Sequence, residues 1–213
     1  MNMELPEVDS ALLTKFLVEL LKSPSPTGFA QEAIALTDHV FHNLPGVKTK
    51  RLPRGGLMVT VEGEHDDAPR GLTAHADTLG AMVKAIKPSG RLMLTKIGGV
   101  IWNTVEGEGC TIYTRESKRI RGSILVTTAS IHVFGEKLAE TPRKEENMEV
   151  RLDERVTNAD ETRTLGISVG DFVSFDPRVE LTNGFVRSRH LDDKACVACL
   201  VEAVRALSSA GVK

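Results

Sequence analysis

The chain has 213 residues, 41% of them hydrophobic, which is enough to bury a core in one domain or two small ones. A net charge of -2 and an aromatic content of 4% argue against nucleic acid as a partner, because they supply neither a basic surface nor stacking platforms. Three cysteines are too few for a disulfide scaffold, and no apolar run approaches the length of a membrane span. The first residues also lack the features of a secretory signal. We therefore expect a cytoplasmic protein with no membrane partner.

Two amphipathic helices are expected near the start of the chain. Residues 10–22 carry leucines and phenylalanine at helical spacing, and Ser10 is a suitable N-cap. A segment with two prolines and a glycine ends this helix, and a second helix is expected over 29–43.

Three β-like runs follow these helices, at 47–52, 57–61 and 70–75, and the third leads into a His-x-Asp motif. Side chains alternate along a strand, so His75 and Asp77 would leave the same face at its carboxyl end, where open α/β sheets bind ligands. An imidazole can hold a metal ion through one nitrogen while a nearby carboxylate steadies it. A surface pair or a satisfied core histidine is the alternative for such a motif on its own.

Helical periodicity disappears between residues 79 and 184, where short β-like runs alternate with glycines. This pattern predicts a small β-barrel or sandwich inserted into the first domain. We therefore expect a first domain made of 1–78 plus 185–213, and an inserted β-rich domain over 79–184. The β-like runs of the insertion are 92–94, 98–102, 111–114, 123–134 and 172–175.

An acidic pair, Asp192-Asp193, opens the last predicted helix, which spans 192–207. Acidic residues are common at helix starts because they suit the helix dipole. Histidine and aspartate are also metal ligands, and the acidic pair together with His75 and Asp77 indicates half of a metal site.

Three other residues beside this pair have the chemistry of ligands. His190 lies two residues before Asp192, and in extended chain it would share that residue's face. Cys196 and Cys199 form a C-x-x-C pattern, but they fall inside the apolar helix pattern without a second Cys or His pair to complete four ligands. We interpret both cysteines as small, buried helix residues.

The segments 71–80 and 189–194 resemble the His-x-Asp-x-x-Gly and Asp-Asp-(Arg/Lys) stretches of the M42 family of metallo-aminopeptidases, which includes glutamyl aminopeptidase and the tetrahedral, TET-type enzymes. Gly170-Asp171-Phe172-Val173 is similar to the Gly-Asp strand that precedes the second stretch in that family. The resemblance implies an α/β fold: an aminopeptidase-like α/β catalytic domain, present in part, with an inserted β-barrel-like domain that helps the protein dimerise.

The resemblance also implies a set of roles. His75 would bind one of two divalent metal ions, zinc or cobalt, and Asp192 would bridge both. Asp77 would be the catalytic residue that orients or tunes the histidine's metal, and Asp193 would assist or cap the helix. Peptides would be the substrates, losing their N-terminal residues to attack by metal-activated water. The implied partner is a second copy of the chain, in dimers that build to a dodecamer.

In the family, a Glu-Glu pair that supplies base and ligand, a further Asp and a final His follow this helix. Only three residues follow Ala210 here, so we expect the 213-residue chain to be inactive alone. A non-catalytic assembly or binding fragment is therefore the main alternative. Glycoside hydrolysis is a weaker one, because the adjacent Asp192 and Asp193 diverge and cannot flank one glycosidic bond.

Overall fold

The computed structural model describes residues 5–65 and 67–211, and the chain divides into two compact units. Unit 1 contains residues 1–78 and 177–213, and unit 2 contains 79–176. The α/β class and the barrel-like sheet confirm the predicted fold class. The boundary that we expected between 184 and 185 falls later than the observed one, because the segment from 177 belongs to unit 1.

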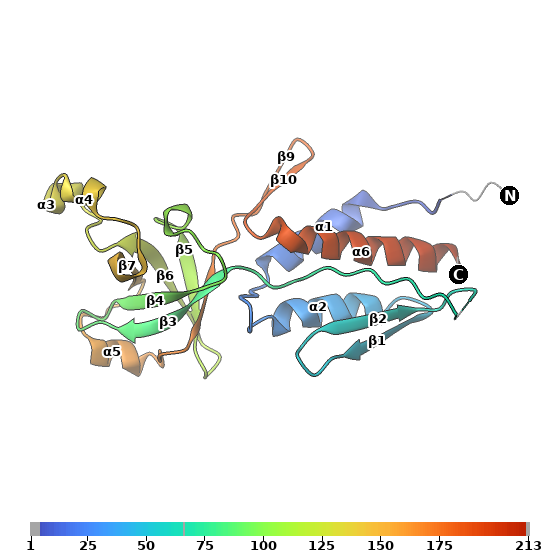
Figure 1. The fold of residues 1–213 in the computed structure, drawn as a ribbon, viewed down its shortest axis with the longest axis horizontal. Coiled ribbons are helices and arrows are strands. Elements are labelled where there is room, and N and C mark those ends of the chain that lie inside the picture. Colours follow the sequence, from blue (N-terminus) through green and yellow to red (C-terminus); the bar gives the residue numbers. More distant parts are fainter. Residues whose placement is uncertain (1–4, 66, 212–213) are drawn as a thin grey trace. The chain divides into compact units, whose positions relative to one another are not determined.

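Unit 1 is a set of three helices with two separate β-hairpins (Figure 1). Helix α1 contacts α6 and α2, and α2 also contacts the β1–β2 hairpin. The buried side chains of these helices form one apolar core. The elements are α1 (Ser10–Lys22), α2 (Gln31–His42), β1 (Val47–Arg51), β2 (Leu57–Val61), β9 (Glu180–Thr182), β10 (Phe185–Arg187) and α6 (Leu191–Ala210).

Helix α1 spans the residues that its periodicity predicted, but its N-cap is Asp9 and not Ser10. The Asp9 carboxylate accepts hydrogen bonds from the backbone N–H groups of Ala11 and Leu12, at 2.9 and 3.0 Å. A carboxylate reaches these exposed donors and also suits the positive end of the helix dipole. Ser10 is instead the first helical residue, and its carbonyl accepts a hydrogen bond from the hydroxyl of Thr14.

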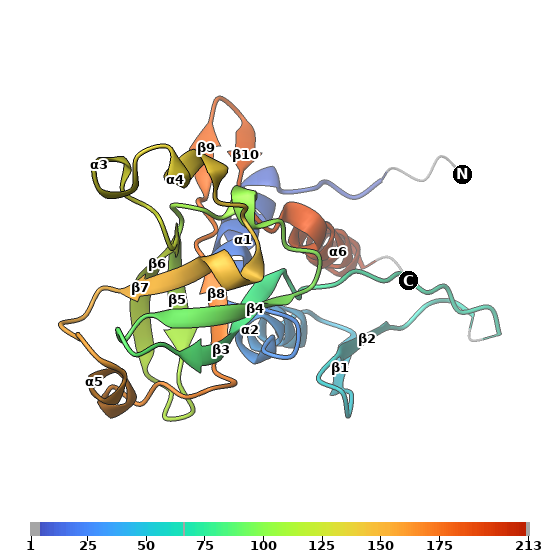
Figure 2. The same cartoon turned by 60° about the vertical axis from the view of Figure 1, so that its left-hand side comes forward.

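Unit 2 is a closed antiparallel barrel with strand order β3-β4-β7-β6-β5-β8, and β8 pairs back onto β3 (Figure 2). Short helices α3 and α4 lie at one end of the barrel and α5 lies at the other. Its strands are β3 (Gly80–Ile86), β4 (Leu92–Ile97), β5 (Gly109–Tyr113), β6 (Arg119–Val126), β7 (Met148–Leu152) and β8 (Phe172–Phe175). The helical elements are η1 (Trp102–Thr104), α3 (Ile131–Phe134), α4 (Lys137–Glu140), η2 (Glu145–Asn147) and α5 (Ala159–Thr164).

The barrel is filled by side chains that alternate along each strand. Strand β6 shows the pattern: Ile120, Gly122, Ile124 and Val126 are buried, whereas the residues between them are more exposed. Such alternation is what a closed sheet with one apolar interior requires. The barrel therefore has its own core, distinct from that of unit 1.

Three predicted β-like runs have a different structure. Residues 70–75 do not form a regular strand. The neighbouring strands β1 and β2 pair with each other and not with this segment, and after it an isolated β-bridge joins Thr78 to Pro26. Residues 98–102 begin with a glycine at φ 77° and turn into η1. The run 123–134 ends as a strand at Val126 and then forms helix α3, since β-propensity is a weak preference that local context overrides.

Within the described part of the chain, no helix combines the length and apolar character needed to cross a bilayer.

Candidate metal centre

His75 and Asp192 come together in unit 1 although 117 positions separate them in the sequence. The Nε2 atom of His75 lies 3.2 Å from Oδ1 of Asp192. On the other side of the ring, Nδ1 lies 3.1 Å from the backbone oxygen of Asp77 and 3.3 Å from its Oδ1. The imidazole therefore sits between two aspartates. His75, Asp77 and Asp192, to which the resemblance gave metal-binding or catalytic roles, lie in this one cluster.

The ring faces acceptors on both sides, because Nδ1 faces two oxygens of Asp77 and Nε2 faces the Asp192 carboxylate. A neutral ring has one N–H, so if Nδ1 donates to Asp77, the Nε2 lone pair faces the Asp192 carboxylate. That contact needs a proton or a cation between the two atoms. Burial alone would lower the pKa of His75, but the Asp77 carbonyl and the charges of Asp77, Asp192 and Asp193 outweigh it and raise this pKa.

Asp77 is held in place by the loop that follows α1. The hydroxyl of Thr27 donates a hydrogen bond of 2.5 Å to Oδ2 of Asp77. The backbone also joins these segments, because the N–H of Thr78 donates to the carbonyl of Ser25 at 2.7 Å and the N–H of Thr27 donates to that of Thr78 at 3.2 Å. The segment carrying His75 thus takes its position from loop contacts instead of from a strand ladder.

Asp193, at the start of α6, contacts the backbone of His75. Its Oδ2 accepts a hydrogen bond of 3.3 Å from the backbone N–H of His75. The side-chain hydrogen bond from Cys196 has the largest effect and lowers the pKa of Asp193; burial opposes it, and the backbone N–H and the charge of His75 lower this pKa further. Asp193 therefore contacts both His75 and Cys196, and its capping role stays a prediction.

The start of α6 is irregular, unlike the helix predicted to begin at 192. Asp192 and Asp193 have non-helical backbone angles and are joined by a cis peptide bond, and His190 before them has φ 76°. Asp192 is left with its side chain 95% exposed beside His75.

Lys194 follows the acidic pair and is the largest fully buried side chain of the described residues. Its Nζ donates hydrogen bonds to the carbonyl oxygens of Leu20 and Ser23, at 2.8 and 2.7 Å. These carbonyls belong to the end of α1, which favours a cation. Burial nevertheless lowers the pKa of Lys194 to about 8. The sequence analysis missed this role, and a lysine directly after two aspartates offered no signal that it would be buried.

The two cysteines of α6 are exposed, which corrects our expectation that they are buried. The apolar pattern of this helix is broad, and its buried positions include Val197, Ala198 and Val201 instead. Glu202 is buried, and it accepts hydrogen bonds from the backbone N–H of Asp9 and from Arg205. It is therefore engaged away from the His75 cluster.

The donors present fit one part of a metal site. Two ligands of a tetrahedral ion with bonds of about 2.0–2.1 Å lie roughly 3.3 Å apart, and Nε2 of His75 and Oδ1 of Asp192 are 3.2 Å apart. Residues 5–65 and 67–211 contain no group of three His, Cys, Asp or Glu side chains placed to hold an ion. The described part of the chain thus supplies two adjacent ligand atoms, Nε2 of His75 and Oδ1 of Asp192, but not a complete set of metal ligands.

Comparison with solved structures shows which proteins share this fold. The fold is similar to that of a TET aminopeptidase from the marine-sediment archaeon Thaumarchaeota archaeon SCGC AB-539-E09, with a TM-score of 0.81 and 21% identity over 94% of this chain and 55% of that one. It is also similar to the TET1 peptidase of Pyrococcus horikoshii, which can assemble into a tetrahedron or a large octahedral shell, with a TM-score of 0.74 and 22% identity over 93% and 57% of the two chains.

The sequence itself matches the family model for M42 glutamyl aminopeptidase over residues 55–213. It is 46% identical over 200 residues to YhfE of Bacillus subtilis (strain 168), a protein whose name proposes an aminopeptidase. That match covers 93% of this chain and 57% of YhfE, so the chain spans little more than half the length of this relative. The chain belongs to the M42 aminopeptidase family.

Proposed function

We propose that this chain forms part of a metal-dependent aminopeptidase that releases N-terminal residues from peptides, and that His75 and Asp192 hold divalent metal at its active site. The observation that carries the proposal is the 3.2 Å approach of His75 Nε2 to Asp192 Oδ1, with Asp77 against the opposite nitrogen. Membership of the M42 family supports the reaction class. Zinc or cobalt suits a mixed nitrogen and carboxylate donor set.

Some residues of the cluster would bind the metal ion, and others position those ligands. His75 would hold the ion through Nε2 and Asp192 would hold it through Oδ1, and the exposed side chain of Asp192 would also be accessible to a second ion. Asp77 would accept the Nδ1 proton of a ring that binds the ion through Nε2, while Thr27 holds the Asp77 carboxylate. A divalent ion, when bound, supplies Lewis acidity and lowers the pKa of water.

Metal binding by the protein tests this assignment without requiring turnover. Zinc is titrated calorimetrically into the wild-type protein, His75→Ala and Asp192→Asn, with cobalt absorption spectra as a second readout. We expect weak binding by the wild type and at least about a tenfold loss in each variant, since half of the available ligands is removed. His65→Ala is the matched control, because His65 is an exposed histidine of the same unit outside the cluster. Equal affinity of all four proteins would refute the metal assignment.

A non-catalytic assembly or binding role is the second candidate, favoured by the lack of a third aimed ligand among the described residues. The same titration separates the two, because that role predicts no dependence of metal affinity on His75. We further propose that the protein forms homo-oligomers, on the strength of the fold shared with the P. horikoshii peptidase. Light scattering of the purified protein tests this.

We also propose a cytoplasmic location, because Cys110, Cys196 and Cys199 are all free thiols, as a reducing compartment maintains them.

A further inference from the structure

Helix α6 of unit 1 carries two thiols on its exposed surface. Cys196 and Cys199 are both exposed, whereas Val197 and Ala198 between them are buried. The non-helical backbone angles inside α6 occur before this pair, at 192–193. Residues three apart on a regular α-helix are neighbours on one face, so the two thiols lie on the same side of α6. The C-x-x-C pattern is therefore a dithiol open to solvent.

Helix geometry sets the distance between the two thiols. With a rise of about 1.5 Å per residue and a Cα radius of about 2.3 Å, the Cα atoms of Cys196 and Cys199 lie roughly 5 Å apart. Their Cβ atoms are about 5–6 Å apart, and rotation about each Cα–Cβ bond moves the sulfur atoms closer together or farther apart. Two sulfurs that share one ion are roughly 4–5 Å apart, since a metal–sulfur bond measures about 2.3 Å. The pair can therefore hold one ion without unwinding the helix.

The charges around the pair favour a cation. The thiol of Cys196 donates a hydrogen bond to the Asp193 carboxylate, and the charge of Asp192 also acts on this thiol. Asp193 in turn accepts the backbone N–H of His75. The dithiol thus neighbours the candidate metal centre through Asp193, but its sulfur atoms are distinct from the nitrogen and oxygen donors of that centre.

The number of ligands narrows the choice of ion. Thiolates select soft ions, chiefly copper(I) and zinc. Zinc takes four protein ligands in structural sites. In the part of the chain that the structure describes, no three His, Cys, Asp or Glu side chains are placed to hold an ion, so the pair lacks the further ligands of such a site. Copper(I) is satisfied by two thiolates in a nearly linear arrangement, and the pair suits that ion.

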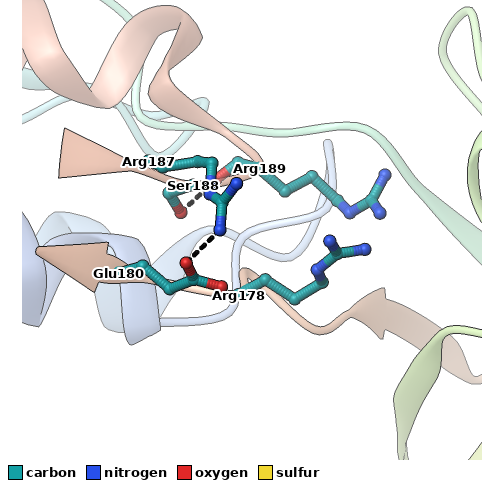
Figure 3. Close-up of a pocket in the computed structure, with 5 residues that line it drawn as sticks. All are labelled: Arg178, Glu180, Arg187, Ser188 and Arg189. Carbon is teal, nitrogen blue, oxygen red and sulfur yellow. Dashed lines mark hydrogen bonds and ion pairs between the residues drawn. The ribbon is translucent and has the colours of Figure 1, made fainter. Parts of the chain in front are cut away.

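The polar cavity of unit 1 does not suit a soft cation. This cavity of about 260 Å³ lies beside the β9–β10 hairpin (Figure 3). Its one carboxylate, that of Glu180, pairs with Arg187 across the hairpin. Positively charged arginines repel a cation, and they make up three of the five lining residues: Arg178, Glu180, Arg187, Ser188 and Arg189. The dithiol of α6 therefore remains the better cation site outside the His75 cluster.

We propose that Cys196 and Cys199 together bind one copper(I) ion per chain. Binding forms two sulfur–copper bonds, breaks two S–H bonds and releases both protons to solvent, with no electron transferred. Cys196 thereby gives up the hydrogen bond that it donates to Asp193. The His75 cluster has nitrogen and carboxylate donors, so the two sites select different ions by the softness of their ligands.

Competition for copper(I) tests the proposal. Fully reduced protein is added without oxygen to the coloured copper(I) complex of bicinchoninate, with ascorbate present, and the loss of colour gives the affinity and the stoichiometry. We expect one ion per wild-type chain, and at least about tenfold weaker binding in Cys196→Ser and in Cys199→Ser, because each variant loses one of two ligands. Cys110→Ser should bind as the wild type does, because Cys110 is buried in unit 2.

A variant with the same number of exposed thiols tests their spacing. Cys199→Ala/Ala203→Cys places the second thiol at another exposed position of α6. Positions 196 and 203 are separated by about 10.5 Å along the helix axis, which is too far for one ion to span. Copper(I) affinity should therefore fall to that of the single serine variants. Circular dichroism checks the fold of each variant, and the serine variants decide the question if the relocated thiol prevents folding.

Several outcomes would overturn the proposal: no binding by the wild type, equal affinity in the serine variants, tight binding with the relocated thiol, or one ion shared by two chains. His75→Ala should keep wild-type copper(I) affinity, and a loss in that variant would place the ion in the His75 cluster instead. The assay measures no turnover and adds no zinc, so a failure of the aminopeptidase assignment would leave its result unaffected.

Discussion

The Nζ atom of Lys194, at the start of α6, lies 2.8 Å from the carbonyl oxygen of Leu20, near the end of α1. This contact joins the segment that carries Asp192 to the first helix of the chain, across 174 positions of sequence. Lys194 is fully buried, so its ammonium group is shielded from water and depends on the helix-end carbonyls for hydrogen bonds. The packing of α1 against α6 and the position of Asp192 are therefore coupled through one side chain.

Lys194→Met should lower the free energy of unfolding by about 1–3 kcal/mol, because it leaves buried carbonyls without their donor while keeping a similar volume. Urea denaturation at pH 7 measures the change. Lys15→Met is the control, since Lys15 is an exposed residue of α1, and its effect should be within about 0.5 kcal/mol. A stability of Lys194→Met equal to that of the wild type would show that the two hydrogen bonds contribute nothing net.

The acid stability of the barrel should depend on Glu149. Its carboxylate is buried and pairs with Lys87, at 2.7 Å, and with Arg91. Burial opposes ionisation, but the hydrogen bonds from these two side chains outweigh it and lower the pKa of Glu149. A pKa lower in the folded state means that the stabilisation is complete above the unfolded value of about 4.3 and is lost as the pH falls through the folded value.

Glu149→Gln should therefore reduce the free energy of unfolding by about 1–3 kcal/mol at pH 7. The difference from the wild type should shrink below about pH 4.5 as the wild-type carboxylate is protonated. Glu154→Gln, at an exposed position of unit 2, should show neither effect. Chemical denaturation between pH 3 and pH 7 gives both curves, and a difference independent of pH would contradict the assigned pairing.

The three thiols should differ in reactivity. Cys110 is fully buried in the barrel, and burial raises its pKa to about 12, whereas Cys196 and Cys199 are exposed. Only the thiolate reacts, so Ellman's reagent at pH 8 should titrate two thiols in the native protein and three in denaturant. Cys110→Ser should leave the native count at two. Rapid reaction of all three native thiols would show that the barrel interior is open to solvent.

Asp77→Asn should weaken zinc binding by about 10–100-fold, the usual effect of losing a carboxylate that orients a ligating histidine. An amide can present its nitrogen to Nδ1 and so turn the ring to the wrong tautomer. Calorimetric titration measures the affinity. Asp67→Asn, at an exposed loop residue of the same unit, is the control. Unchanged affinity in Asp77→Asn would mean that the backbone carbonyl of Asp77 alone fixes the ring.

The 213-residue chain alone should show no aminopeptidase turnover. Among its described residues no three His, Cys, Asp or Glu side chains are placed to hold an ion, and Glu202 is buried against Asp9 and Arg205, so it does not serve as general base there. Loss of a general base typically costs 10²–10⁴-fold. Release of chromophore from amino-acid anilides with added zinc, cobalt or manganese is the assay. Turnover that disappears in His75→Ala would show that the ligand count is wrong, and His190 would then be the next residue to replace.

The sequence by itself determined the elements whose signals are local. The helix over 10–22 and the strands β1 and β2 follow from helical periodicity and β-like composition. A β-rich insertion was also predictable, because short β-like runs separated by glycines indicate a barrel or a sandwich, and the structure shows the closed barrel. His75, Asp77 and Asp192 were recognised as one cluster through their resemblance to a family, and the geometry brings them together.

Only the tertiary structure decided how that cluster is held. The segment before His75 has strand-like composition but lacks a regular ladder, because a strand depends on partners that lie elsewhere in the chain. The burial of Lys194 and the exposure of Cys196 depend on which face of α6 meets α1, which the broad apolar pattern of that helix does not specify. Hydrogen bonds between distant residues carry no signature in local sequence, and those bonds position this site.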